Sequence, residues 1–140
     1  MAKPTLALVT GCFDLLHYGH FKFLSFAASK ADKLIVALEN DNYLKTNKGP
    51  YRPLFTQKIR KYNLEQIKFV DQVVCIKNPT NYIKLLQKIR PNILIISSGD
   101  PKYKIKKQIC QELKINLIVF PRLKQYSTSK IISSDIFESH

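Results

Sequence analysis

Short apolar runs alternate along the chain with longer amphipathic segments. Five runs, each apolar and partly β-branched, predict strands near Thr5–Thr10, Leu34–Glu39, Gln72–Ile76, Ile93–Ser97 and Asn116–Phe120. Five segments with apolar residues at helical spacing predict helices over Gly19–Lys30, Thr56–Phe69, Asn81–Ile89, Lys102–Leu113 and Ser129–Phe137. Strands buried on both faces and joined through helices are typical of a parallel sheet covered on both sides. The pattern therefore predicts an α/β fold, a Rossmann-like three-layer sandwich around a five-stranded parallel sheet.

The loops that follow the strands are the expected place of function. In a sheet of this kind, ligands bind outside the carboxyl ends of the strands, where the strand order changes direction. Four loops meet that edge: Gly11–His20, Asn40–Pro53, Ser98–Tyr103 and Pro121–Thr128. We expect Asn40–Pro53 to be a long irregular connection, and loops of that length are usually functional or mobile.

The first of these loops carries the strongest chemical signal. It reads Gly11-Cys12-Phe13-Asp14-Leu15-Leu16-His17-Tyr18-Gly19-His20 and opens a predicted helix. Free N–H groups and the helix dipole favour an anion at a helix N-terminus. His17 and His20 share one helix face, and Gly19 has no Cβ, so a ligand can approach the backbone closely. These residues favour a nucleoside triphosphate over a small anion.

Metal binding is an alternative use of the same loop. Cys12, His17 and His20 are zinc-ligand types, but they lack a convincing fourth ligand and Cys-x-x-Cys spacing. We therefore expect no metal site built from protein side chains. Asp14 is either a catalytic carboxylate or, the interpretation we prefer, a residue that caps the helix or orients the loop.

Length, composition and net charge limit the classes of protein to which this chain can belong. The 140 residues predict a single domain over 1–140, and no apolar run could span a bilayer, so we expect a cytoplasmic protein without membrane association. Three cysteines at unrelated spacings predict free thiols. The net charge of +13 comes mostly from scattered lysines, which predicts a solvated surface that attracts phosphate substrates rather than a specific nucleic-acid interface.

Two motifs resemble one family. Gly11 to His20 matches the signature Gly-x-Phe-Asp-x-x-His-x-Gly-His of the cytidylyltransferase-like nucleotidyltransferases at every fixed position. Downstream, Arg122, Ser127 and Thr128 match the family's Arg-Thr-Glu-Gly-Ile-Ser-Thr-Thr, whereas residues 123–126 differ. Within that family, the chain resembles glycerol-3-phosphate cytidylyltransferases and heptose-1-phosphate adenylyltransferase domains. The resemblance implies the fold of the HxGH nucleotidyltransferases and a homodimer.

The motifs and the resemblance together define a set of expected site residues. The expected catalytic residues are His17, His20 and Lys48. The expected nucleotide-binding residues are Gly11, Cys12, Phe13, Gly19, Lys68, Asp100, Arg122, Tyr126, Ser127 and Thr128. Lys45 and Arg52, in the long loop, are expected to meet the acceptor phosphate, since cations there could close over the transferring group.

The resemblance implies transfer of a CMP or AMP group from CTP or ATP to a small phosphorylated alcohol or sugar, with release of pyrophosphate. Mg²⁺ would arrive with the triphosphate, held by phosphates and water. The chain length, Lys68 and Pro121-Arg122 favour a glycerol-3-phosphate cytidylyltransferase. The alternatives are a sugar-phosphate adenylyltransferase, a nucleotide-binding protein without turnover, and a basic nucleic-acid-binding module.

Overall fold

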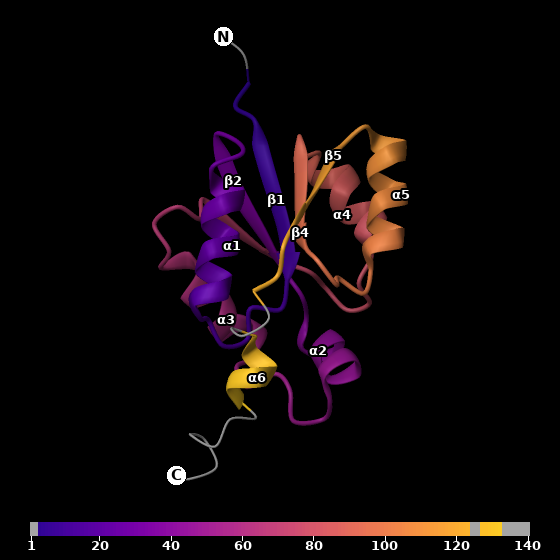
Figure 1. Ribbon diagram of the computed structural model, residues 1–140. Coiled ribbons are helices and arrows are strands. Elements are labelled where there is room, and N and C mark those ends of the chain that lie inside the picture. The colour runs from indigo at the N-terminus through magenta and orange to yellow at the C-terminus, as the bar shows by residue number, and fades with distance from the viewer. Residues whose placement is uncertain (1–2, 124–126, 133–140) are drawn as a thin grey trace.

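The computed structural model describes residues 3–123 and 127–132, and it contains one parallel sheet. The strands are β1 (Leu6–Gly11), β2 (Lys33–Leu38), β3 (Gln72–Cys75), β4 (Ile93–Ser97) and β5 (Asn116–Phe120). They lie side by side in the order β3-β2-β1-β4-β5, and every neighbouring pair is parallel (Figure 1). The chain thus moves outward in one direction from β1 through β3, then returns to the other side of β1 with β4.

Helices connect the strands. They are α1 (Tyr18–Ala28), α2 (Asp41–Lys48), α3 (Gln57–Glu65), α4 (Tyr82–Ile89), α5 (Tyr103–Leu113) and α6 (Thr128–Ile132). The expected Rossmann-like sandwich is confirmed: α1 and α3 cover one face of the sheet and α4 and α5 the other (Figure 1). Of these helices, which lie within residues 3–123 and 127–132, none is long and apolar enough to cross a membrane.

Alternating residues of the central strands fill two separate cores. In β1, Val9 packs with α1 and α3, whereas Leu8 packs with α4 and α5, and both are fully buried. Neighbouring β2 repeats this division, with Val36 in the first core and Ile35 in the second. Burial on both faces explains why these strands read as continuous apolar runs.

Two predicted segments differ from the structure. The long irregular connection predicted over 40–53 is wrong, because α2 occupies most of it. Asn40 caps that helix by accepting a hydrogen bond from the backbone N–H of Tyr43 at 2.8 Å. Only Leu44 is buried in α2, so the segment lacks an apolar stripe that would have predicted a helix. Helix α3 ends at Glu65, four residues before the predicted end, and the predicted helix 129–137 runs beyond the described residues after Ile132.

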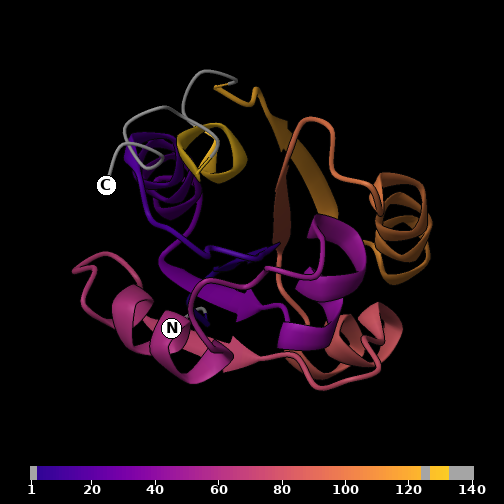
Figure 2. The ribbon, with the colours of Figure 1, turned by 90° about the horizontal axis from the view of Figure 1, so that it is seen from below.

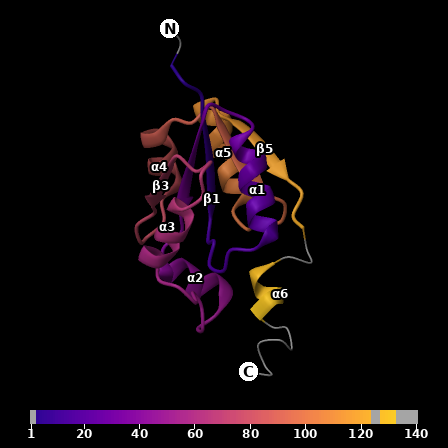
Figure 3. The same cartoon turned by 90° about the vertical axis from the view of Figure 1, so that its left-hand side faces the viewer.

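Two of the six helices in the described part of the chain lie at one end of the sheet (Figure 1). Helices α2 and α6 lie beyond the carboxyl ends of the strands rather than on a face (Figures 1 and 3). Seen from that end, α6 lies beside α1, and α2 lies across the end of the sheet from it (Figure 2). The switch in strand order between β1 and β4 falls between them, which is where ligands bind in sheets of this type.

Candidate active site

A cavity of about 280 Å³ opens at the carboxyl ends of β1 and β4. Its lining includes the six expected residues of the first motif, Gly11, Cys12, Phe13, His17, Gly19 and His20. It also includes five expected residues from other segments: Lys48, Arg52, Asp100, Arg122 and Ser127. Segments that are far apart in the sequence therefore meet in one concave site.

The loop after β1 turns sharply at Phe13. Its φ of 48° lies in the left-handed region, which is uncommon for a residue other than glycine. The ring is buried, with its centroid 6.4 Å from that of Phe23 and 5.2 Å from that of His20. A Cβ on Gly11 would lie 2.7 Å from the Phe13 ring, so glycine is required there by close packing. The ring thus forms part of the support beneath the histidine pair.

The two motif histidines stack at the start of α1. Their ring centroids are 3.9 Å apart. His17 is the N-cap residue, and its Nδ1 accepts a hydrogen bond from the backbone N–H of Gly19 at 3.1 Å. A neutral His17 therefore carries its proton on Nε2. Nε2 of His17 and Nδ1 of His20 are buried and have no hydrogen-bond partner among the described residues.

Both histidines are held in the neutral form. Burial, with smaller contributions from His17 and Arg122, lowers the pKa of His20 to about 3. Burial and the Arg122 guanidinium also lower the pKa of His17. Because desolvation disfavours a charged imidazole, the pair offers neutral hydrogen-bonding groups at neutral pH.

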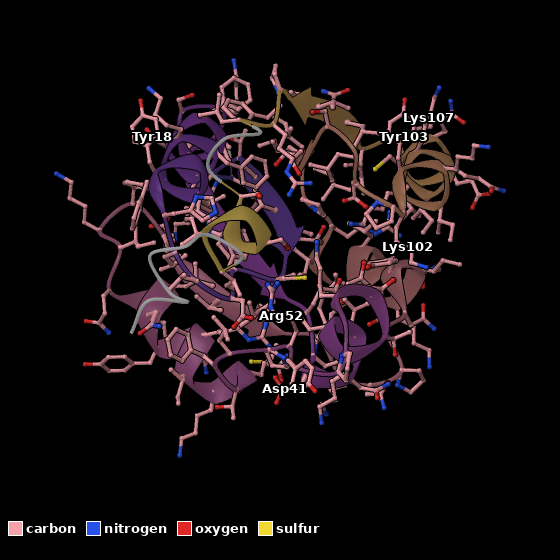
Figure 4. All side chains as sticks on the ribbon, turned by 60° about the horizontal axis from the view of Figure 1, so that its bottom comes forward. Tyr18, Asp41, Arg52, Lys102, Tyr103 and Lys107 are labelled. Carbon is pink, nitrogen blue, oxygen red and sulfur yellow. The ribbon has the colours of Figure 1, made fainter. Side chains whose placement is uncertain are left out.

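Asp14 orients a loop, as we expected from its position. Its carboxylate accepts hydrogen bonds from Arg52 Nε at 2.8 Å and from the backbone N–H groups of Leu54 and Phe55 at 2.7 and 3.0 Å. Arg52 is 9% exposed, and its Nη1 also donates to Ser129 Oγ at 3.3 Å. Arg52 lies near the centre of this end of the molecule (Figure 4). The expectation of a mobile loop cation is therefore corrected, because burial and the ion pair hold Arg52 in place.

Arg60 is a second buried guanidinium that fixes the loops. It is fully buried, and Nη1 donates to the backbone carbonyls of Cys12 at 2.8 Å and Glu39 at 2.9 Å. Its Nε donates to the carbonyl of Phe55 at 2.9 Å, and its Nη2 pairs with Asp41 at 2.6 Å. One side chain thus ties the ends of β1 and β2 to the loop before α3.

The four other cationic residues that we expected at the site differ in whether they line the cavity. Lys48 and Arg122 are exposed and line the cavity, whereas Lys45 and Lys68 are exposed and do not line it. Lys45 lies on α2, and Lys68 lies in the turn between α3 and β3. Tyr126 lies outside the described residues, and Thr128 is the first residue of α6.

Sequence reasoning missed three groups at the cavity floor: Glu39, Tyr43 and Lys106. Glu39 accepts hydrogen bonds from the Tyr82 hydroxyl at 2.7 Å and from Thr80 Oγ1 at 3.2 Å. Burial raises the pKa of Glu39, and it raises the pKa of Tyr43 to about 12. Glu39 directly follows a buried strand, and this position was the available signal for a polar group at the sheet edge.

No cluster of three or more His, Cys, Asp or Glu side chains within 3–123 and 127–132 is arranged to hold a metal ion. The cavity carboxylates already have protein partners: Arg52 for Asp14, Lys106 for Asp100, and Tyr82 with Thr80 for Glu39. Cys12 lines the cavity, and burial raises the pKa of its thiol to about 11. The donor set fits phosphate oxygens better than it fits a bare cation.

The profile of the cytidylyltransferase-like family matches residues 8–139. The chain belongs to the cytidylyltransferase-like family. Membership confirms the expectation of a nucleotidyltransferase. The cavity at the β1/β4 switch is therefore the candidate active site of a cytidylyltransferase-like protein.

Relatives and solved structures agree with this family. Bifunctional protein HldE of Helicobacter pylori strain P12 is 38% identical over 130 residues, which cover 93% of this chain and 27% of the relative. Bifunctional protein HldE of Aliarcobacter butzleri is 38% identical over 112 residues, covering 79% of this chain and 23% of the relative. The chain thus spans about a quarter of the length of these relatives.

The fold has a counterpart among solved structures. The lipopolysaccharide core biosynthesis protein of Thermoplasma volcanium superimposes with a TM-score of 0.73 at 21% identity. The match covers 86% of this chain and 97% of that protein. It confirms the Rossmann-like arrangement of this cytidylyltransferase-like domain.

Proposed function

We propose that this chain transfers an adenylyl group from ATP to the phosphate of a small sugar phosphate and releases pyrophosphate. The observation that carries the proposal is the histidine pair, which has two unpartnered ring nitrogens among the described residues and lines a cavity that Lys48 and Arg122 also line. The neutral N–H donor of His17 and the cations that line the same cavity suit a triphosphate, whose charge must be stabilised while it is redistributed. We propose His17, His20 and Lys48 as the catalytic residues.

In the proposed reaction, an oxygen of the acceptor phosphate attacks the α-phosphorus of ATP. A new P–O bond forms, the bond between the α-phosphorus and the bridging oxygen breaks, and that oxygen leaves with pyrophosphate. The Nε2–H of His17 donates to a phosphate oxygen as negative charge shifts toward the leaving group. Lys48 and Arg122 neutralise the other phosphate oxygens. Mg²⁺ bound to the triphosphate would supply further charge neutralisation, since the described residues offer phosphate donors rather than metal ligands.

Two observations support a sugar-phosphate adenylyltransferase over a glycerol-3-phosphate cytidylyltransferase. The relatives at 38% identity carry the name Bifunctional protein HldE, and the sequence resembles the heptose-1-phosphate adenylyltransferase domain. Lys68, one reason for our first preference, lies outside the cavity. Arg122 is compatible with either nucleotide, because its guanidinium would bind phosphate, which ATP and CTP both carry.

The test is pyrophosphate release in the presence of Mg²⁺, with ATP and CTP offered separately. The acceptors are a set of sugar 1-phosphates and glycerol 3-phosphate. We expect turnover with ATP and one of the sugar phosphates. The His17→Ala variant should lose at least about 100-fold in kcat, as removal of one preorganised donor does. Lys22→Met, on the exposed side of α1, is the matched control and should retain activity.

The alternatives give different results in the same assay. Preference for CTP with glycerol 3-phosphate would establish the cytidylyltransferase and refute the adenylyl proposal. Nucleotide binding without pyrophosphate release from any acceptor in the set would favour a binding protein. Equal activity of His17→Ala and the wild-type chain would remove His17 from the mechanism.

A further inference from the structure

A buried lysine lies beneath the cavity without belonging to any expected motif. Lys106 of α5 is 3% exposed, and its Nζ donates to Thr10 Oγ1 and to Asp100 Oδ2, each at 2.8 Å. Thr10 lies at the end of β1, directly before the glycine of the first motif, and Asp100 follows β4. Lys106 therefore bridges the two strands on either side of the switch in strand order.

The bonding directions of this ammonium group are already occupied. Besides Thr10 and Asp100, Lys106 Nζ lies 4.6 Å from the centroid of the Tyr82 ring, a cation–π distance. An ammonium group has three N–H donors, so little capacity is left for a phosphate oxygen. Lys106 thus acts on a ligand through its neighbours.

The neighbour with the clearest link to a ligand is Asp100. Its Oδ1 accepts the backbone N–H of Lys102 at 2.8 Å, while its Oδ2 accepts Lys106, so both oxygens are oriented. The resemblance places Asp100 beside the nucleotide, and the structure places it in the cavity lining. Loss of the Lys106 contact would release one side of this carboxylate.

Lys106 also offsets acidic charge. Glu39 and Asp100 both line the cavity, and the Tyr82 hydroxyl that donates to Glu39 belongs to the ring beneath Lys106. Without the lysine, two carboxylates would face a polyanionic triphosphate across a low-dielectric cavity, where repulsion is strong.

We infer that Lys106 is a positioning residue of the nucleotide subsite, holding Asp100 in place and offsetting the acidic cavity floor so that a nucleoside triphosphate can bind. The inference rests on the proposed function for the identity of the nucleotide. It assigns to α5 a role in binding in addition to its role in covering the sheet.

The experiment measures equilibrium affinity for a non-hydrolysable ATP analogue by calorimetry, after circular dichroism has confirmed folding. Lys106→Met should weaken affinity by about 10- to 100-fold, the usual consequence of losing a charge-assisted hydrogen bond. Lys107→Met is the matched control on the next residue. Lys107 is exposed, lies over the Tyr103 ring outside the cavity at the outer side of α5, and should stay within about 2-fold (Figure 4).

A double-mutant cycle separates positioning from a general structural effect. If Lys106 acts through Asp100, adding Lys106→Met to Asp100→Asn should cost less than about 3-fold, because the carboxylate it orients is already gone. Independent additive losses would contradict the positioning role. Should Lys106→Met fail to fold, Asp100→Asn and the isosteric Thr10→Val take its place, and unchanged affinity in Asp100→Asn overturns the inference.

The results also separate this inference from the proposed function. Unchanged affinity in folded Lys106→Met, or no affinity in the wild-type chain, overturns the role of Lys106. Binding of the analogue by the wild-type chain without pyrophosphate release overturns the proposed reaction alone. In that case the affinities of the Lys106 and Lys107 variants still decide the inference.

Discussion

The depressed pKa of His20 makes folding stability depend on pH. Burial beside His17 and Phe13 lowers the pKa of His20 to about 3, whereas an unfolded chain has a histidine pKa of 6.5. Between these values the unfolded chain binds a proton at this position and the folded chain does not. Stability rises with pH wherever the unfolded state binds more protons. The contribution of His20 is therefore complete above pH 6.5 and is lost as the pH falls toward 3.

The size of this effect follows from the two pKa values. A pH of about 4.5 lies roughly two units below the pKa of the imidazole in the unfolded chain, so that imidazole is protonated. The His20 imidazole of the folded chain is still neutral at this pH. Each unit corresponds to about 1.4 kcal/mol, so His20 should cost about 2.5 kcal/mol of unfolding free energy between pH 7.5 and 4.5. His17 shifts in the same direction and adds to the loss in the wild-type chain.

The assay is urea unfolding of the wild-type chain and of His20→Asn at both pH values. Asparagine cannot be protonated in this range, so the variant should lose about 2.5 kcal/mol less on acidification than the wild-type chain. Comparing the pH dependence, rather than the stability at one pH, removes whatever packing the substitution costs. Equal pH dependence in the two proteins would show that His20 is protonated in the folded state and refute its burial as a neutral group.

Three further predictions concern the support of the site. Arg60→Lys, which cannot reach its several carbonyl partners at once, should lower the unfolding free energy by about 3 kcal/mol in urea titrations. Lys58→Met, on the exposed side of α3, should change it by less than about 0.5 kcal/mol, and an equal loss would contradict the role of Arg60. Asp14→Asn should speed hydrogen exchange of the two amides that donate to it by at least about 10-fold, and unchanged exchange would refute its control of that loop. Gly11→Ala should lower the free energy of unfolding, measured by thermal unfolding, by about 1 to 3 kcal/mol because the new Cβ clashes with the Phe13 ring. If the ring is the cause, adding Phe13→Leu to Gly11→Ala should recover part of the lost stability.

Those parts of the fold that depend on local pattern were predictable from sequence. The apolar runs predicted all five strands. Strands β1, β2 and β4 are buried on both faces, so their runs are continuous and short, and the edge strands β3 and β5 keep short apolar runs although they are less buried. The first motif was predictable because its residues, from Gly11 to His20, are contiguous and lie at one strand-to-helix junction. Helix α2 was not predictable from the sequence pattern, because a helix with one buried residue depends on its cap and on tertiary contacts.

The burial of Lys106 and Arg60 was harder to predict, because charged residues are usually exposed. On α5, Lys106 precedes the buried Ile109 and Cys110 by three and four residues, so it shares their face. On α3, Arg60 precedes the buried Leu64 by four. A lysine in a chain of net charge +13 is ordinary, and its helical register alone marks it as buried. Register thus contained the signal, but only the tertiary structure supplies the carbonyls and carboxylates that make burial of a cation possible.

These buried charges explain how the loops around the candidate active site are held in place. Apolar packing fixes the sheet and the four helices on its faces, but the loops at the carboxyl ends carry backbone groups that apolar side chains cannot satisfy. Arg60 satisfies three loop carbonyls, and Asp14 satisfies two loop amides together with the Arg52 guanidinium. Because the partners of each are fixed before a ligand arrives, the donors around the cavity need little reorganisation during reaction. Such preorganisation is the main source of electrostatic catalysis, so variants of Arg60 or Asp14 should lower kcat even though neither group is proposed to touch the substrate.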